Sequence, residues 1–199
     1  MQVAAPLPNG WQMAARRTAM HWPDAEAVFK RHRSHLMVSV MGENQDHLQA
    51  ARIITAVTGA LAATQPVCSG ILWASEVANS RETLIDLSYR AFAPYPDFPS
   101  ALWISMHPSQ DAGTSIVRAV TVGLRKFIGR ELAVEGQRSQ LKEVLTTEQG
   151  LINYLLQPGI ELNDGDTIGE SANERIKVRA VNSPNFNGLP VFAIRLPSP

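Results

Sequence analysis

Apolar residues dominate one continuous stretch of the chain, residues 35–73, around which the rest is organised. Residues 36–41 are apolar at nearly every position, as in a strand that is covered on both faces. Residues 44–64 carry apolar side chains at spacings of three and four, which predicts an amphipathic helix packed on a sheet. Residues 67–73 form a second apolar run after Pro66, so the pattern predicts a β-α-β unit with a central first strand. The expected apolar helix face consists of Ala50, Ile53, Ile54, Val57, Ala60, Leu61 and Thr64.

The pattern beyond residue 73 predicts more helices and strands. Residues 81–92 favour a helix with Leu84, Ile85, Leu87, Ser88 and Phe92 inward. Residues 101–106 and 115–123 favour the two strands of a hairpin, whereas residues 127–135 are ambiguous. Residues 139–155 predict a second long helix, with Glu148 among its periodic positions. Gly150 in this helix indicates either close packing or a break, and a single helix is favoured.

The C-terminal part of the chain alternates as strands do. Residues 174–181 place Ile176 and Val178 on one face and Lys177 and Arg179 on the other, so one face of this strand is solvated. A turn at residues 187–188 then leads into a last strand at residues 191–196. Together the elements predict an α+β fold, a single domain with a mixed or antiparallel sheet of about five to six strands packed by two long helices.

Residues 1–34 differ from the remainder, because two prolines and a glycine fall within their first ten positions. We expect an N-terminal arm over residues 1–34 and a single α+β domain over residues 35–199. A short helix at residues 24–31, capped by Asp24, is expected to turn Ala27 and Val28 toward the domain. Trp11 and Trp22 are expected to fasten the arm to the domain.

Composition favours a soluble globular protein: 45% of the 199 residues are hydrophobic and 18% are charged. No stretch approaches the roughly 20 apolar residues of a membrane helix, and the first residues do not resemble a signal peptide. We therefore expect a cytoplasmic protein with no membrane contact. Residues 1–34 carry five Lys or Arg against two acidic residues, and the remainder carries 13 against 16. This balance favours a basic protein partner over nucleic acid.

Motifs for catalysis, metals and cofactors are not found. The five histidines lie far apart and Cys68 has no second cysteine, so no metal site is expected. Residues 42–46 offer one glycine and two carboxylates, which would oppose phosphate. The glycine between two aspartates at residues 163–169 favours a tight turn over a calcium loop. Without a nucleophile motif, we expect neither an enzyme nor a cofactor.

A loop at residues 94–99 is the first candidate for a recognition surface. Three prolines prevent regular hydrogen bonding there, and the loop carries two aromatic rings that a connection does not need. The residues expected to bind a partner are Tyr95, Asp97, Phe98, Trp11 and Trp22.

The order of several short motifs resembles a bacterial family of uncharacterised α+β domains. The motifs are residues 35–40, 70–73, 102–105, 163–169 and 174–178. The resemblance covers roughly residues 35–197. Some members of that family lie beside type VI secretion effector genes. The resemblance therefore implies an interaction protein, foremost an immunity protein that neutralises a secreted toxin, a nuclease being one candidate, by direct binding.

Two alternatives stay open at this point. One is an enzyme or small-molecule-binding domain with a pocket near Trp73 and His107, because His107 stands at the end of an expected strand. The other is an accessory protein of a secretion apparatus. Self-association into a homo-oligomer also stays open.

Overall fold

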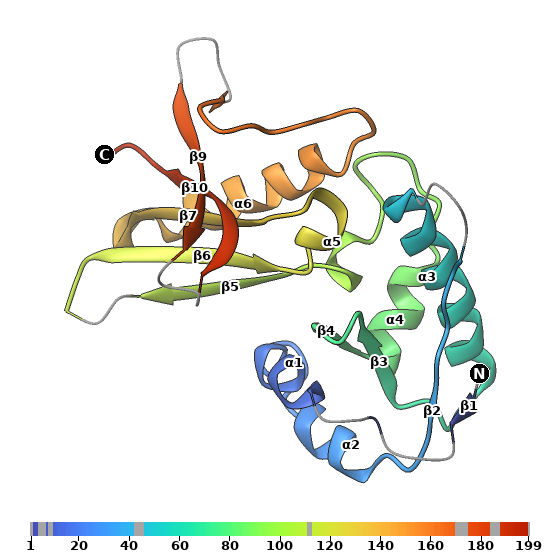
Figure 1. Cartoon of the computed structure of the whole chain (residues 1–199). Helices are drawn as coiled ribbons and strands as arrows, with labels where there is room; N and C mark the ends of the chain where they lie inside the picture. The colour runs from blue at the N-terminus through green and yellow to red at the C-terminus, as the bar shows by residue number, and fades with distance from the viewer. Residues whose placement is uncertain are drawn as a thin grey trace. The chain divides into compact units, whose positions relative to one another are not determined.

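The computed structural model describes residues 2–3, 7, 10–41, 46–110, 113–169, 175–183 and 188–198. The chain divides into two compact units, Met1–Ser105 and Met106–Pro199 (Figure 1). The expected boundary after residue 34 does not coincide with this division, because the arm packs into the first unit. The predicted turns at residues 42–45 and at residue 187, and the first residue of the strand at 174–181, lie outside the described residues.

The first unit contains mainly helices and two short sheets. Its elements are β1 (Gln2–Val3), α1 (Trp11–Arg17), α2 (Ala25–Arg31), β2 (His35–Leu36), α3 (His47–Thr64), β3 (Gly70–Trp73), β4 (Val77–Ser80), α4 (Arg81–Ser88) and the 3-10 helix η1 (Ser100–Leu102).

The predicted β-α-β pairing is wrong. β2 pairs antiparallel with β1, and β3 pairs antiparallel with β4, so the strands on either side of α3 belong to different sheets. The expected central strand at residues 36–41 is reduced to β2, and Met37 and Met41 are exposed. An apolar run indicates burial, but it does not determine which strand will pair with it.

The helix α3 is present as predicted, but it packs through a different face and against a different partner. Its buried residues are Ala51, Thr55, Gly59 and Ala62, and its main neighbour is α4. A Cβ at Gly59 would lie 2.2 Å from Ser88 Oγ, which shows how closely the two helices approach. Val57, expected inward, is exposed. The interface between α3 and α4 is therefore formed by small side chains of α3, and the larger apolar residues of α3 lie outside it.

The arm forms a small core of its own with the β3–β4 hairpin. Trp11, Ala14, Ala15, Ala25, Phe29 and Ala78 are buried together, and Trp22 and Leu72 pack against them. The prediction that Trp11 and Trp22 fasten the arm is confirmed. The helix α2 buries Ala25 and Phe29 in place of the expected Ala27 and Val28, and Asp24 makes no side-chain cap bond.

Two further expectations for the first unit are corrected. The expected strand at residues 101–106 is largely η1, because the helical turn starts directly after Pro99, and β5 begins only at Ser105. The helix at residues 81–92 ends at Ser88, which leaves Phe92 exposed while Leu84 is buried.

The second unit is built on a six-stranded sheet in the order β5-β6-β7-β10-β9-β8. β7 and β10 run parallel, while β6, β9 and β8 join antiparallel neighbours. Its elements are β5 (Ser105–Gln110), β6 (Ile116–Val122), α5 (Arg125–Ile128), β7 (Glu131–Gln137), η2 (Arg138–Gln140), α6 (Leu141–Leu155), β8 (Thr167–Ile168), β9 (Ile176–Ser183) and β10 (Leu189–Arg195). The predicted α+β class, the mixed sheet and the C-terminal hairpin are confirmed.

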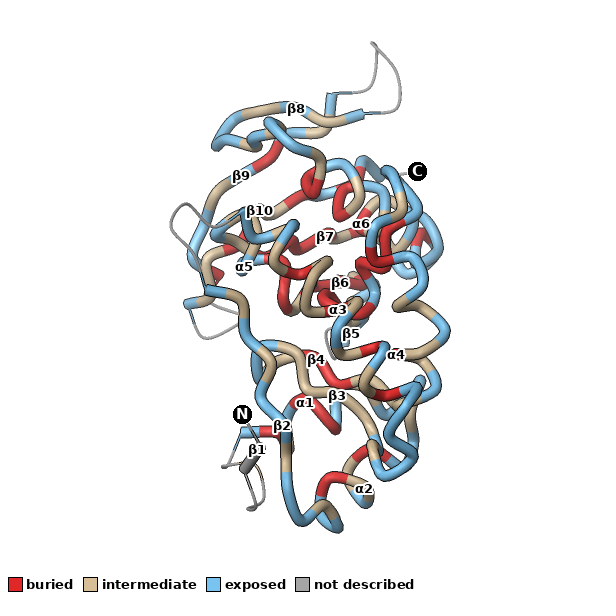
Figure 2. Tube along the Cα trace, turned by 90° about the vertical axis from the view of Figure 1, so that its right-hand side faces the viewer, coloured by how far each residue is buried: buried red, intermediate tan, exposed pale blue. Residues whose placement is uncertain are grey.

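Helix α6 covers one face of this sheet (Figure 1). A Cβ at Gly136 on β7 would lie 2.9 Å from Val144 of α6, so Leu132, Val134 and Gly136 point toward the helix. Figure 2 shows buried positions along β6, β7 and α6. Helix α6 is the long helix of the second unit, and α3 belongs to the first unit. The single helix across Gly150 is confirmed, and a Cβ at Gly150 would meet nothing within 4 Å.

Candidate functional site

Exposed aromatic side chains gather in residues 89–98, which we call the aromatic segment. Tyr89 is 84% exposed, Phe92 57% and Tyr95 48%. Among the described residues, the one other exposed aromatic side chain is Tyr154 on α6, at 44%. Large apolar rings that are exposed together are typical of interaction sites.

The C-terminal end of the aromatic segment packs on a buried ring. The ring of Phe98 stacks on that of Trp103 at a centroid distance of 6.0 Å, and Tyr95 leans on Phe98 at 6.3 Å. Trp103 Nε1 donates a hydrogen bond of 2.8 Å to Thr55 Oγ1 on α3. These contacts tie the buried C-terminal end of the segment to Trp103 and α3.

Arg52 of α3 also contacts the aromatic segment. Its guanidinium carbon lies 5.6 Å from the centroid of the Phe98 ring, and its Nη2 donates to the Ala93 carbonyl oxygen at 3.3 Å. Arg52 is one helical turn before Thr55, so one face of α3 binds both Phe98 and Trp103. Arg52 therefore joins two residues of the segment, Ala93 and Phe98, to α3.

The five predicted partner-binding residues separate by burial. Tyr95 and Asp97 are exposed, whereas Phe98 is buried. Trp11 is also buried and stacks on Phe29 at 5.5 Å, and Trp22 lies half-buried against the same ring at 5.7 Å. Phe98, Trp11 and Trp22 thus stabilise the first unit, and Tyr95 and Asp97 are the predicted residues that a partner can reach.

The residues of the alternative pocket fall in different units. Trp73 lies in the first unit and packs on Trp103 with ring centroids 6.3 Å apart. His107 lies on β5 in the second unit. The described residues contain no group of three or more His, Cys, Asp or Glu side chains that could hold a metal ion.

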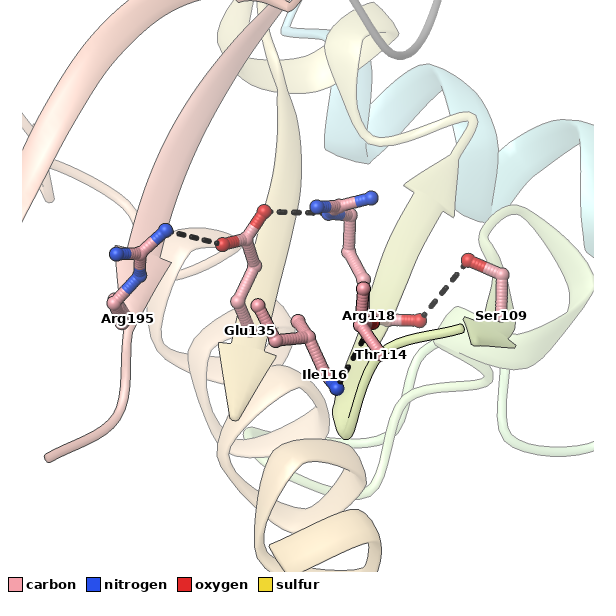
Figure 3. A network of polar contacts seen from close by, with 6 residues as sticks. All are labelled: Ser109, Thr114, Ile116, Arg118, Glu135 and Arg195. Carbon is pink, nitrogen blue, oxygen red and sulfur yellow. Dashed lines mark hydrogen bonds and ion pairs between the residues drawn. The ribbon is translucent and has the colours of Figure 1, made fainter. Parts of the chain in front are cut away.

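Three charged side chains form a row across neighbouring strands of the second unit. Arg118 on β6 is opposite Glu135 on β7, and Glu135 is opposite Arg195 on β10. Glu135 accepts from Arg118 Nε at 2.5 Å and from Arg195 Nη2 at 3.1 Å, and Figure 3 shows the two guanidinium groups on either side of its carboxylate. Sequence spacing could not predict this row, because it depends on the register of three strands.

Two carboxyl groups are buried within the second unit, Glu131 on β7 and Glu148 on α6. Glu131 accepts hydrogen bonds from Thr121 Oγ1, Gly123 N and Leu124 N, which compensate its burial. Glu148 is fully buried, and neither of its oxygens has a hydrogen-bond partner among the described residues. Burial, and secondly the nearby charge of Glu131, raises the pKa of Glu148 to about 8. Its position on an apolar helix face was the signal in the sequence.

Comparison with known proteins gives one match. A family model described as a domain of unknown function (DUF4261) matches residues 120–195, less than half of the chain. The match covers most of the second unit and does not reach the aromatic segment. Searches of curated proteins and of solved structures found no match. No helix among the described residues is long and apolar enough to cross a membrane.

Proposed function

We propose that this protein is a cytoplasmic protein-binding module, and specifically an immunity protein that neutralises a type VI secretion toxin by direct binding. The observation that carries the proposal is the aromatic segment. Tyr89, Phe92 and Tyr95 are exposed within seven residues, and the ring of Tyr95 leans on the buried ring of Phe98. Aromatic side chains dominate the energetics of protein interfaces, and a rigid base lowers the entropic cost of binding.

The order of the motifs resembles a family of which some members lie beside type VI secretion effector genes, and this resemblance supports a secreted toxin as the partner. An immunity protein must bind its toxin tightly before the toxin reaches its target, and preorganised contact residues favour such binding. The arrangement of Arg52 and Phe98 behind the aromatic segment supplies that preorganisation. In this account the protein has no catalytic task.

Co-expression tests the proposal. The product of the neighbouring gene, which the proposal expects to be the toxin, is expressed in a bacterial host with the wild-type chain, with Tyr95→Ala, or with Tyr154→Ala. Tyr154 is the matched control, because it is a tyrosine of similar exposure on α6. We expect the wild type and Tyr154→Ala to restore growth and to co-elute with the toxin, and Tyr95→Ala to do so less well. No rescue by the wild type and no complex on a sizing column would refute the proposal.

The alternative role as an accessory of a secretion apparatus gives a different result. Association with tube or baseplate components, without rescue from the toxin, would favour that role.

A further inference from the structure

One face of the sheet in the second unit collects cationic side chains, and we call it the basic sheet face. Arg118, Glu135 and Arg195 are directly opposite one another on β6, β7 and β10. Side chains that are opposite in a ladder share a face, and α6 covers the other face, toward which Gly136 points. The row in Figure 3 therefore lies on the face away from α6.

Strand β9 extends this face with two more cations. Arg179 is opposite Ala193, and Arg195 follows Ala193 by two residues, so both arginines share the face. Lys177 precedes Arg179 by two residues and points the same way. Four cationic side chains from three strands thus lie on one face of the sheet.

The carboxylates of this face leave it positive. Glu135 pairs with both the buried Arg118 and the exposed Arg195, whereas Lys177 and Arg179 add two further positive charges to the face. Glu131 belongs to the same face by its position on β7, but it is buried and bonded to the turn at residues 121–124. Lys177, Arg179 and Arg195 are exposed, and neither Lys177 nor Arg179 has an ion pair with any described residue.

We propose that the basic sheet face binds an acidic segment of a partner polypeptide. Arginine pairs with carboxylates through two parallel hydrogen bonds, and the ion pair to Glu135 holds the guanidinium group of the exposed Arg195. Arg118, Val120, Ala133 and Val191 of the same face are buried, so the accessible cations are Lys177, Arg179 and Arg195. Val181 and Ala193 beside the cations offer apolar contact to such a segment. The described residues of this face include no aromatic ring on which a nucleic-acid base could stack, which favours a polypeptide.

This inference stands apart from the proposed function, because it concerns the second unit and a partner of opposite charge to the basic one expected from composition. It also assigns a role within residues 120–195, which the family model matches and which contain Lys177, Arg179 and Arg195.

Fluorescence anisotropy with a fluorescein-labelled decaglutamate peptide tests the inference on the full chain. The variants are Arg179→Glu and, as the control, Lys142→Glu on α6. Both residues are exposed and each substitution changes the net charge by the same amount. We expect saturable binding to the wild type at low salt, a loss of about tenfold or more in affinity for Arg179→Glu, and little change for Lys142→Glu. Lys177→Glu should reproduce the loss, and circular dichroism checks that all variants are folded.

Three results would overturn the inference. The first is the absence of saturable peptide binding to the wild type. The second is an equal loss in Arg179→Glu and Lys142→Glu, which would indicate a response to net charge alone. The third is tighter binding of a labelled decathymidylate oligonucleotide than of the peptide, which would assign the face to nucleic acid. Because the toxin is not used, failure here leaves the rescue experiment unaffected.

Discussion

The rings of Phe98 and Trp103 lie nearly parallel, at an interplanar angle of 12°, and both are buried. Tyr95, three residues before Phe98, is exposed. The loop thus supplies one ring to the core and one to the surface. Phe98 packs on Trp103, and Tyr95 is the ring that the proposed function assigns to the partner.

Phe98→Ala should therefore destabilise the first unit by about 3–5 kcal/mol, the usual cost of removing a buried phenylalanine ring. Phe92→Ala is the control, because its ring is exposed and its removal should change stability by about 0.5 kcal/mol or less. All four tryptophans lie in the first unit, so urea unfolding followed by tryptophan fluorescence reports on that unit alone. Equal midpoints for the two variants would show that Phe98 does not fix the loop.

Thr55→Val should cost about 1–3 kcal/mol, because it keeps the side-chain volume and leaves the buried Trp103 Nε1–H without its acceptor. Thr58→Val on the same helix is the control, since the Thr58 hydroxyl bonds only to carbonyl oxygens of its own helix. The same fluorescence measurement compares them. A smaller effect at Thr55 than at Thr58 would contradict the assigned role of this hydrogen bond.

Glu148 should make the second unit less stable as the pH rises. Its pKa is about 8 in the folded protein against an ordinary value of 4.5, so the folded state binds the proton more tightly than the unfolded state. Stability from this group is fully present below pH 4.5 and is lost toward pH 8, at roughly 1.4 kcal/mol for each pH unit.

Glu148→Gln should remove this decrease of the free energy of unfolding with pH, and it should therefore stabilise the protein most at pH 8. Urea unfolding followed by far-UV circular dichroism at pH 5, 6, 7 and 8 measures it. The control is Glu143→Gln, which alters an exposed carboxyl group on the same helix. If the free energy of unfolding changes with pH equally in the wild type and in Glu148→Gln, the pKa of Glu148 is not raised in the folded protein.

Glu135→Ala should destabilise the second unit by about 3 kcal/mol, because it leaves the buried Arg118 without this carboxylate. Arg195→Ala removes the exposed partner of the same carboxylate and should cost about 1 kcal/mol or less. Unfolding followed by circular dichroism separates the two. Equal losses of unfolding free energy in the two variants would mean that the ion pair of Glu135 with the exposed Arg195 contributes as much as its ion pair with the buried Arg118.

The sequence predicted helices better than strand partners. The periodic patterns in α3 and α6 located both helices, because amphipathic spacing is a local property. The pairing of β2 and β3 was not predicted, since an apolar run does not specify which strand lies beside it. The face through which α3 packs was missed because small residues such as Gly59 decide it, and small residues carry little hydrophobic signal.

The candidate sites were predictable to different degrees. Tyr95 followed from an aromatic ring in a proline-rich loop, but burial of Phe98 in the same loop required the position of Trp103. The solvated face of β9 followed from the alternation around Lys177 and Arg179. Its continuation through Arg195 and Arg118 required the register of β10, β7 and β6.

The central claim is that the aromatic segment contacts the partner through Tyr95. Isothermal titration calorimetry of the purified toxin against wild type, Tyr95→Ala and Tyr154→Ala tests it most directly. We predict a loss of about 2 kcal/mol in binding free energy, roughly 30-fold in Kd, for Tyr95→Ala and an unchanged Kd for Tyr154→Ala. An unchanged Kd for a folded Tyr95→Ala variant would contradict the claim.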